Sequence, residues 1–437
     1  MSNLTYSLCF LLFPAIMFAQ IEGGQFSGSS ASLPMIELFP DASTTAYLGP
    51  LVGPSGVSLF FSQQGQRQNI GVDNLSDIWV SYQQSNGQWC KAINIGAPVN
   101  NRLANQIVGI SSSEDTLFIA ENWKALGFST QQGRRWSNPK PMTILGRSNW
   151  AVIADMHVSA DGRVLLFSAL TDKQDFDLFF SRRLSPTTWG KAQPLGPEVN
   201  TTDNEQSIYL AYDGKTIYFS RDGANGFGGQ DVYRSKRLDQ SWMQWSTPEN
   251  LGASLNTEAN EWALTVDASG KRAYLSREMP EGIGQLLALD LPKQLRPEPA
   301  TVLKGRLLGE VVPAEVAIAI SSVGEEERPR TITVAADGTY QAIIPQGIDV
   351  SLSANAEGFF SESNSIALSG DVLEELDYDP SMLTASLEQD ETYLKRNEEI
   401  QLLQLKLSSL NDNLEAVQQE RAAYQEQIAK ERAQFEA

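Results

Sequence analysis

The sequence predicts a mainly β protein with three parts: a β-propeller, then a small β-sandwich, then a C-terminal coiled-coil helix. Three observations lead to this fold class. A phrase of about 50 residues, made only of short strands and turns, occurs five times between Ser55 and Ser276, which is typical of a propeller. Near Ala300 this repeat gives way to an irregular series of strands. The last stretch contains neither Gly nor Pro and has a helical spacing of apolar residues.

Each repeat has a turn, a short apolar strand and a further strand. The apolar segments are Ser55–Ser62, Ser113–Ala120, Asp161–Ser168, Asp213–Ser220 and Ser269–Ser276. The further strands are Asp77–Ser81, Leu126–Thr130, Asp177–Ser181, Asp231–Ser235 and Gln285–Leu289. β-Branched and aromatic residues dominate both sets, as is usual in strands. We predict five blades, or six if a degenerate repeat is present.

The fifth repeat lacks the outer piece that the other four have. Pro292, Pro297 and Pro299 interrupt the chain where that piece is expected, and a matching segment, Met35–Phe39, precedes the first repeat. We therefore predict that this early segment crosses over as the outer strand of the last blade. Such a crossover closes the ring and covers an exposed strand edge. The predicted propeller spans residues 34–299.

The N-terminus is typical of an export signal. Leu8–Ala19 is apolar, ends in a small residue and is too short to cross a bilayer comfortably, so residues 1–19 are predicted to be a signal peptide cleaved near Ala19. Residues 20–33 are rich in Gly and Ser and are predicted to be a flexible lead-in. No other segment reaches about 18 apolar residues. We expect a periplasmic protein without a membrane span, the extracellular space being the alternative.

Beyond the propeller the sequence predicts a sandwich over residues 300–375 and a linker over 376–384. The predicted strands are Val302–Leu308, Val316–Ile320, Arg330–Val334, Gly338–Ile344 and Val350–Ala354. Short strands separated by turns are typical of a small antiparallel sandwich.

Residues 385–437 are predicted to form a coiled coil, because apolar residues recur in alternating steps of three and four. The predicted oligomerisation seam consists of Ile400, Leu403, Leu407, Leu410, Leu414, Val417, Tyr424 and Ile428. We expect this helix to join copies of the chain or to bind a partner helix. A lone helix packed on its own propeller is the alternative.

Composition excludes several classes of chemistry. The net charge of −20 makes nucleic acid an unsuitable partner. The single histidine, His157, lies on the innermost strand of the third repeat and is expected to be a core or channel-wall residue. Cys90 would be the only cysteine after cleavage, and is expected to be a buried, inert strand residue, with an intermolecular disulfide as the alternative. Catalytic triads and zinc sites of the usual ligands are therefore excluded, and we predict no catalytic residue, metal or cofactor.

Carboxylate chemistry stays open. A glycosidase needs only two carboxylates, although Asp161 and Asp213 precede Gly and serve turns. Ser129–Trp136 resembles the aspartate-box turn of sialidase-type propellers with Gln131 at the aspartate position, and that turn is structural. The loop Asp222–Asp231 has three oxygen-bearing side chains that suit calcium, but an ordinary inter-strand loop is the preferred interpretation.

Two stretches resemble known families. The propeller part resembles the TolB-type WD-like repeat, in Asp213–Ser220, Phe227–Ser235 and Trp245–Thr257. The next part resembles the carboxypeptidase regulatory-like domain, in Asp337–Tyr340, Ile344–Gly347 and Leu352–Phe359. Together, over about 35–370, they are similar to the middle of periplasmic OmpA-family proteins of the Bacteroidota similar to PorE, which implies a place near the type IX secretion machinery. The helical repeats and the peptidoglycan-binding OmpA-like domain of those relatives are missing, so the resemblance does not carry over peptidoglycan anchoring.

These observations predict an exported, non-enzymatic scaffold. One propeller face would bind a protein partner in a cell-envelope or secretion-associated assembly, because loops from several blades converge on a rigid surface. The coiled coil would oligomerise or tether it. The alternative is a carbohydrate-active enzyme or glycan-binding protein that uses the mouth of the propeller channel. Convergent carboxylates and aromatic side chains at that mouth would favour the alternative, and a flat, uncharged face would favour the scaffold.

Overall fold

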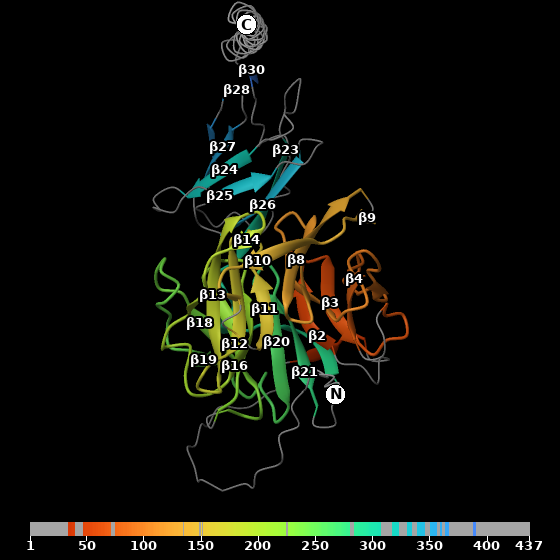
Figure 1. Cartoon of the computed structure of the whole chain (residues 1–437), viewed down its shortest axis with the longest axis vertical. Helices are drawn as coiled ribbons and strands as arrows, with labels where there is room; N and C mark the ends of the chain where they lie inside the picture. Colours follow the sequence, from red (N-terminus) through yellow and green to blue (C-terminus); the bar gives the residue numbers. More distant parts are fainter. Residues whose placement is uncertain are drawn as a thin grey trace, which may run out of the picture.

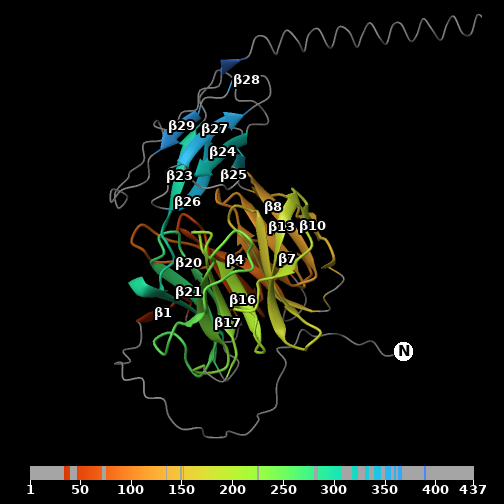
Figure 2. The same ribbon diagram turned by 90° about the vertical axis from the view of Figure 1, so that its left-hand side faces the viewer.

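The computed structural model describes most of the predicted propeller and the strands that follow it. The described residues are 34–39, 47–70, 75–133, 135–147, 150, 152–223, 226–279 and 284–306, and the later strands given below. Figures 1 and 2 show a ring of sheets with a smaller group of strands beyond one end of it. The predicted signal peptide, lead-in and linker, and all eight predicted seam residues, lie outside the described residues.

The propeller strands follow the predicted repeats. The first repeat has β2 (Tyr47–Val52), β3 (Ser58–Gln64), β4 (Ser76–Tyr82) and β5 (Ile93–Asn94). The second has β6 (Asn105–Ile110), β7 (Thr116–Glu121), β8 (Ala125–Gln132), β9 (Arg135–Trp136) and β10 (Lys140–Ile144). The third has β11 (Ile153–Val158), β12 (Val164–Leu170), β13 (Phe176–Ser185), β14 (Thr188–Trp189) and β15 (Gln193–Pro194). The fourth has β16 (Glu205–Leu210), β17 (Thr216–Arg221), β18 (Asp231–Lys236) and β19 (Glu249–Asn250), and the fifth has β20 (Asn260–Val266), β21 (Arg272–Glu278) and β22 (Gly284–Asp290).

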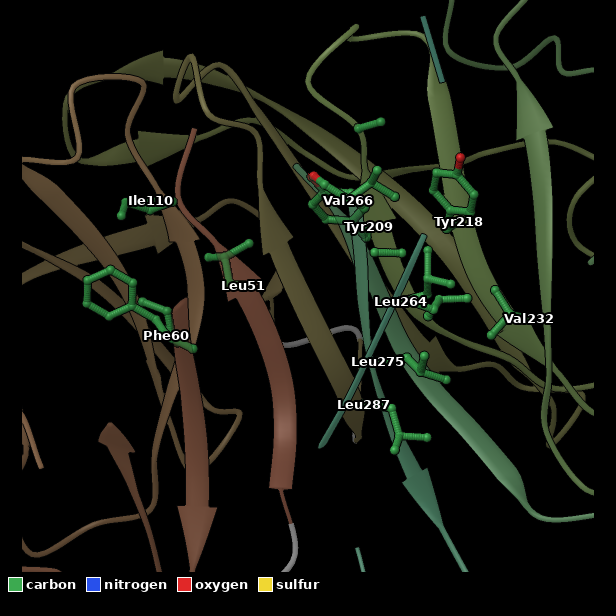
Figure 3. Close-up of a cluster of buried hydrophobic side chains, with 14 of the residues drawn as sticks. Leu51, Phe60, Ile110, Tyr209, Tyr218, Val232, Leu264, Val266, Leu275 and Leu287 are labelled. Atoms are coloured by element: carbon green, nitrogen blue, oxygen red, sulfur yellow. The ribbon is translucent and has the colours of Figure 1, made fainter. Parts of the chain in front are cut away.

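The first strand of each repeat lies innermost. These strands contact one another in ring order, β2 with β6, β6 with β11, β11 with β16, β16 with β20, and β20 with β2. The second and third repeats share one ten-stranded sheet, because β10 pairs in parallel with β14. The buried cluster in Figure 3 joins side chains from several repeats, among them Leu51, Tyr209, Tyr218 and Leu264. The mainly β propeller fold is thereby confirmed, and the choice between five and six blades stays a prediction.

The predicted crossover of the N-terminal segment is confirmed. Strand β1 (Met35–Glu37) pairs antiparallel with β22, with Met35 opposite Leu289. The pairing extends one residue further, because the Leu38 amide donates to the Leu286 carbonyl at 2.9 Å. The outer edge of the last repeat is thus covered by a strand from the opposite end of the propeller sequence.

The serine that ends the apolar segment of most repeats connects neighbouring repeats. Ser168 Oγ donates to the Glu205 carbonyl at 2.7 Å, and Ser220 Oγ donates to the Glu261 carbonyl at 2.8 Å. Ser62 Oγ accepts a hydrogen bond from the Ile107 amide. In each case the partner lies on the innermost strand of the following repeat, so this motif position stabilises the ring as well as its own sheet.

A repeated asparagine fixes the loop that leads from one repeat to the next. The side-chain amides of Asn100, Asn200 and Asn256 each donate to, and accept from, the backbone of one residue on the third strand of the preceding repeat, at 2.8 to 3.1 Å. Asn100 and Asn256 are fully buried. The two hydrogen bonds of each asparagine resemble those between paired residues of neighbouring strands. They anchor the connecting loop to the third strand without adding a further strand to the sheet.

Replacement of Arg277 by Met should lower the free energy of unfolding by about 3–5 kcal/mol. Arg277 Nε lies 2.7 Å from Glu261 Oε1, and its Nη2 donates to the Leu255 carbonyl. Glu261 is fully buried, so the substitution leaves an uncompensated carboxylate in the interior. Urea denaturation measures the loss. Arg272→Met is the matched control, because its partner Asp290 is exposed and the pair should contribute less than about 1 kcal/mol. Equal losses in the two variants would contradict this reasoning.

The strands after the propeller lie near their predicted positions. β23 (Ala300–Arg306) pairs with β26 (Thr339–Pro345). A second sheet has the order β25 (Arg330–Thr333), β24 (Ala317–Ser322), β27 (Val350–Asn355) and β29 (Ser363–Ile366), with antiparallel neighbours throughout. The boundaries of this part, residues 300–375, and its membership of the carboxypeptidase regulatory-like family stay predictions. Among the described residues, no helix is both long and apolar enough to cross a membrane.

The predicted start of the coiled coil at residue 385 is too early. Strand β30 (Glu388–Gln389) pairs antiparallel with β28 (Phe359–Phe360). The lack of Gly and Pro in this stretch does not distinguish a helix from a short strand that finds a partner far away in the sequence. The remainder of the predicted helix, residues 390–437, lies outside the described residues.

Candidate functional site

The two ends of the propeller differ in what covers them. At one end, which we call the hairpin end, the innermost strands turn into the second strands, at 53–57, 111–115, 159–163, 211–215 and 267–271. Both views place β23 to β29 beyond this end (Figures 1 and 2). The opposite end, which we call the loop face, carries the described residues of the loops 65–75, 97–104, 122–124, 145–152, 171–175, 197–204, 222–230 and 253–259.

Side chains close the propeller axis near the hairpin end. His157 packs edge-on against Tyr209, with ring centroids 4.9 Å apart, and the Tyr209 hydroxyl donates to the Val266 carbonyl. The Tyr212 hydroxyl donates across the axis to the Val52 carbonyl. Leu51, His157 and both tyrosines line a cavity of about 10 Å³, which is room for roughly one water molecule. This closed region does not admit a larger ligand.

His157 is buried, as expected for a core or channel-wall residue. Burial lowers its pKa to about 3, although a hydrogen bond to the Leu210 backbone acts in the opposite direction. The ring is therefore neutral at physiological pH and is held in place by Tyr209.

Asp155 lies on the same innermost strand as His157, β11, two residues earlier in the chain. Its carboxylate accepts hydrogen bonds from the backbone amides of Ile208, at 2.8 Å, and Ser168, at 3.1 Å. Ile208 lies in the bulge of β16, where the register shifts and Ser207 adopts a positive φ of 54°. Asp155 is half-buried, and burial raises its pKa to about 7 despite these hydrogen bonds. Asp155 therefore holds the bulge of β16 in place by its hydrogen bond to Ile208. A pKa near 7 is also what a general acid needs.

Glu205 is the second carboxyl in this region with a strongly raised pKa, but it has no access to solvent. It is fully buried and accepts hydrogen bonds from the hydroxyl and amide of Thr201. Burial raises its pKa to about 7, with a smaller contribution from Asp177 and an opposing one from Arg221. Glu205 therefore stabilises its loop and cannot touch a substrate. Neither Asp155 nor Glu205 was predicted as a site residue, although both are charged residues at innermost-strand positions.

The loop face exposes apolar side chains from four different loops. Ile70, Leu103, Val152 and Phe227 have 41%, 42%, 44% and 47% of their surface exposed. Trp123, Trp150 and Trp262 are half-buried at the same end. Exposed apolar side chains surrounded by polar loops are the usual anatomy of a binding surface.

Arg147 ties two of these tryptophans together. Its Nη1 donates to the Trp150 carbonyl at 2.8 Å and its Nη2 to the Trp123 carbonyl at 3.2 Å. Trp123 and its neighbour Asn122 both have positive φ, of 55° and 50°. A bulky residue rarely adopts this conformation, which is sustained only where the surroundings fix it and is most common at functional positions.

Charges are unevenly distributed over the loop face. The loops of the first two repeats carry the exposed cations Arg67, Arg102 and Lys124. The loops of the third to fifth repeats carry the acidic residues Asp172, Asp203 and Glu258, with Lys173 as the neighbouring cation. The face is therefore charged, contrary to the uncharged face that was expected of a scaffold, and its two halves differ in sign.

One expectation about a single residue changes. Cys90 is half-buried and lies outside any strand, so the predicted buried strand residue is wrong. It follows an exposed turn, and its carbonyl accepts a hydrogen bond from Ser81 Oγ.

The loop Asp222–Asp231 uses its carboxylates internally. Asp222 accepts hydrogen bonds from the backbone and side-chain amides of Asn204, while Asp231 accepts from Phe227 and Asn250. Asn225 of this loop lies outside the described residues. The described carboxylates thus favour the ordinary loop over the calcium site, and the described part of the chain holds no cluster of three His, Cys, Asp or Glu ligands.

No protein-family model matches the sequence, and no curated protein matches it either. Similar solved structures include TolB from Acinetobacter baumannii, which is 13% identical to this chain with a TM-score of 0.30. The match covers 70% of this chain and 64% of TolB, so this chain spans less than two thirds of the length of TolB. The similar structures also include an endo-arabinase from Bacteroides thetaiotaomicron, with 13% identity and a TM-score of 0.39 over 59% and 96%. A GH62 α-L-arabinofuranosidase catalytic domain from Coprinopsis cinerea has 10% identity and a TM-score of 0.37 over 57% and 96%. TolB is thus among the solved structures to which this chain is similar, and membership of the TolB-type family stays a prediction.

The prediction that the chain is not an enzyme is corrected by these findings. Glycoside hydrolases are among the similar structures, so the exclusion of enzymatic activity does not stand. The exclusion rested on missing triads and zinc ligands, and a hydrolase that works with carboxylates needs neither.

Proposed function

We propose that the protein is an exported adaptor of the cell envelope whose loop face binds a protein partner. The observation that carries the proposal is the combination, on this one end, of exposed apolar side chains from four loops with charges of opposite sign on its two halves. Apolar anchors supply most of the affinity at protein interfaces, and separated charges orient the partner. We also propose that the ring has five blades, and the contacts of five innermost strands in ring order support this count. The place of the protein in the periplasm and near a secretion assembly rests on the predicted signal peptide and the family resemblance.

Substitution of Phe227 or Ile70 by Asp should weaken capture of the partner by about 30-fold or more, corresponding to about 2 kcal/mol for an interface anchor. Both side chains are exposed, so the fold should tolerate the change. The measurement is quantitative co-purification with tagged protein from the source cells. Leu238→Asp is the matched control, because Leu238 is 66% exposed in a turn at the hairpin end. A partner recovered equally with all three variants would place the binding surface elsewhere.

A second candidate function is action on a glycan at the channel mouth, and two separate observations favour it. Asp155 has a raised pKa, and the half-buried Trp262 donates its indole N–H to Glu278 at 3.3 Å. Asp155 would supply one of the two carboxyl groups that a glycosidase needs, and the Trp262 ring would supply an aromatic surface. Release of reducing sugar from cell-wall polysaccharide by the wild type, and its loss in Asp155→Asn, would select this candidate over the adaptor.

We also propose that the C-terminal segment joins copies of the chain or binds a partner helix, on the strength of the predicted seam. Light scattering should give a multimer for the mature protein and a monomer when residues 390–437 are removed. This truncation keeps β30 and its pairing with β28. A monomer in both forms would contradict self-association and leave a partner helix. A multimer in both forms would contradict the proposed role of the segment.

A further inference from the structure

We infer that residues 291–300 form a strap that holds the following strands in a fixed position on the propeller, rather than a loose linker between two domains. The prolines of this segment look like an interruption in the sequence. In the structure the segment is bonded along its length to the fourth and fifth repeats. This inference does not depend on the proposed partner.

Both ends of the strap are bonded to the backbone of the β20–β21 hairpin region. The Leu291 amide donates to the Lys271 carbonyl and the Ala300 amide to the Ala268 carbonyl, each at 2.8 Å. Between them lies a short 3-10 helix, Lys293–Leu295. Leu291 and Leu295 are buried in the main apolar cluster, so the strap is part of the propeller core.

Side chains of the fourth repeat bind the middle of the strap. The Tyr218 hydroxyl donates to the Leu295 carbonyl at 2.7 Å, and Arg234 Nη1 donates to the Gln294 carbonyl at 2.6 Å. Tyr218 is fully buried, and only 12% of the Arg234 side chain is exposed. The Tyr218 hydrogen bond is buried and therefore costly to leave unmade, so the strap does not detach without exposing an unsatisfied group.

Asp213 connects the strap to a repeat motif. Its carboxylate accepts from the Lys215 and Thr216 amides of its own turn and also from the Glu298 amide of the strap, at 3.1 Å. The carboxylate of Glu298 lies 3.9 Å from Lys215 Nζ and 3.7 Å from Lys236 Nζ. These ion pairs are exposed and add little, so the buried carboxylate of Asp213 is the stronger anchor.

The backbone of the strap also approaches the propeller closely. A Cβ on Gly270 would lie 3.2 Å from the Pro297 carbonyl oxygen, and Gly270 has a positive φ of 73°. Prolines at 292, 297 and 299 restrict the backbone to few conformations, which lowers the entropy lost when the strap binds.

The strap continues directly into the C-terminal strands, with no residues between them. Ala300, the last anchored residue, is also the first residue of β23. The strands beyond the hairpin end are therefore held over it, and the loop face at the opposite end is left free (Figures 1 and 2).

Hydrogen–deuterium exchange on the full chain tests the strap. In the wild type, peptides covering 291–300 should exchange at rates similar to those of the propeller strands and at least about 100-fold more slowly than an unprotected peptide. In the double variant Tyr218→Phe, Arg234→Met, exchange in these peptides should rise by about tenfold or more, while peptides from β6 and β7 stay unchanged. Lys293→Ala is the matched control, because this side chain is exposed.

A wild-type strap that exchanges as fast as an unprotected peptide would overturn the inference. So would a folded double variant with unchanged exchange in the strap. If the double variant does not fold, the wild-type rates alone decide the question, because they need no substitution.

Discussion

Deletion of residues 34–39 is expected to lower the free energy of unfolding by about 3–5 kcal/mol and to make the protein self-associate. The deletion removes strand β1 and uncovers the edge of β22, whose residues Leu286 to Leu289 are apolar. It also removes Phe39, whose ring lies 5.4 Å from that of Phe61. An exposed edge of this composition is a template for pairing with another chain. Urea denaturation and light scattering together measure both effects.

Ile36→Ala is the control for the deletion, since this side chain is 55% exposed although it lies on the same strand. It should change stability by no more than about 0.5 kcal/mol and leave the protein's mass in solution unchanged. A deletion variant as stable as the wild type, with unchanged mass, would show that β1 does not close the ring.

His157 should make the protein sensitive to acid, by roughly 3–5 kcal/mol between pH 6.5 and pH 3. Burial lowers the pKa of its ring to about 3 in the folded protein, against about 6.5 when unfolded. Between these values the unfolded chain binds one more proton than the folded chain, so stability falls as the pH falls through this window. Urea denaturation at a series of pH values measures the slope.

The variant His157→Gln isolates this contribution, because glutamine is uncharged throughout. The variant loses the contact with Tyr209 and should be less stable at pH 7, yet its stability should fall less between pH 6.5 and pH 3. Asp155 and Glu205 have raised pKa values of about 7, so their contribution has the opposite sign and falls as the pH rises from about 4 to 7. Asp155 and Glu205 are present in the wild type and in the variant, so their contributions to the pH dependence cancel when the two stability curves are compared. Parallel stability curves for the two proteins would contradict the prediction.

The sequence predicted the strands of the propeller because their chemistry is local. A short apolar run marks each repeat, and Gly at the turn and a final Ser mark four of the five. The missing outer piece of the last repeat pointed to Met35–Phe39. The strap was not predicted, because prolines lack amide donors and look like a break. Their neighbours' carbonyls still accept hydrogen bonds from side chains such as Tyr218 and Arg234, which come from a different repeat.

The candidate site was predicted only in outline. That one face of a propeller would bind follows from the fold, but its side chains do not, because an apolar residue such as Ile70 or Phe227 looks the same in sequence whether buried or exposed. The role of Asp155 depends on a bulge in a neighbouring strand that no local pattern marks. The exclusion of enzymes failed for a different reason: it covered triads and zinc, while carboxylate chemistry had been left open.

Site-specific photo-crosslinking in the source cells tests the central claim most directly. A photoreactive phenylalanine analogue is placed singly at Phe227 or Ile70 on the loop face, and at Leu238 or Leu184 at the hairpin end, all of which are exposed. We expect one discrete crosslinked protein from both loop-face positions and none from the hairpin-end positions. Crosslinks formed only from the hairpin end, or no protein crosslink from either loop-face position, would contradict it.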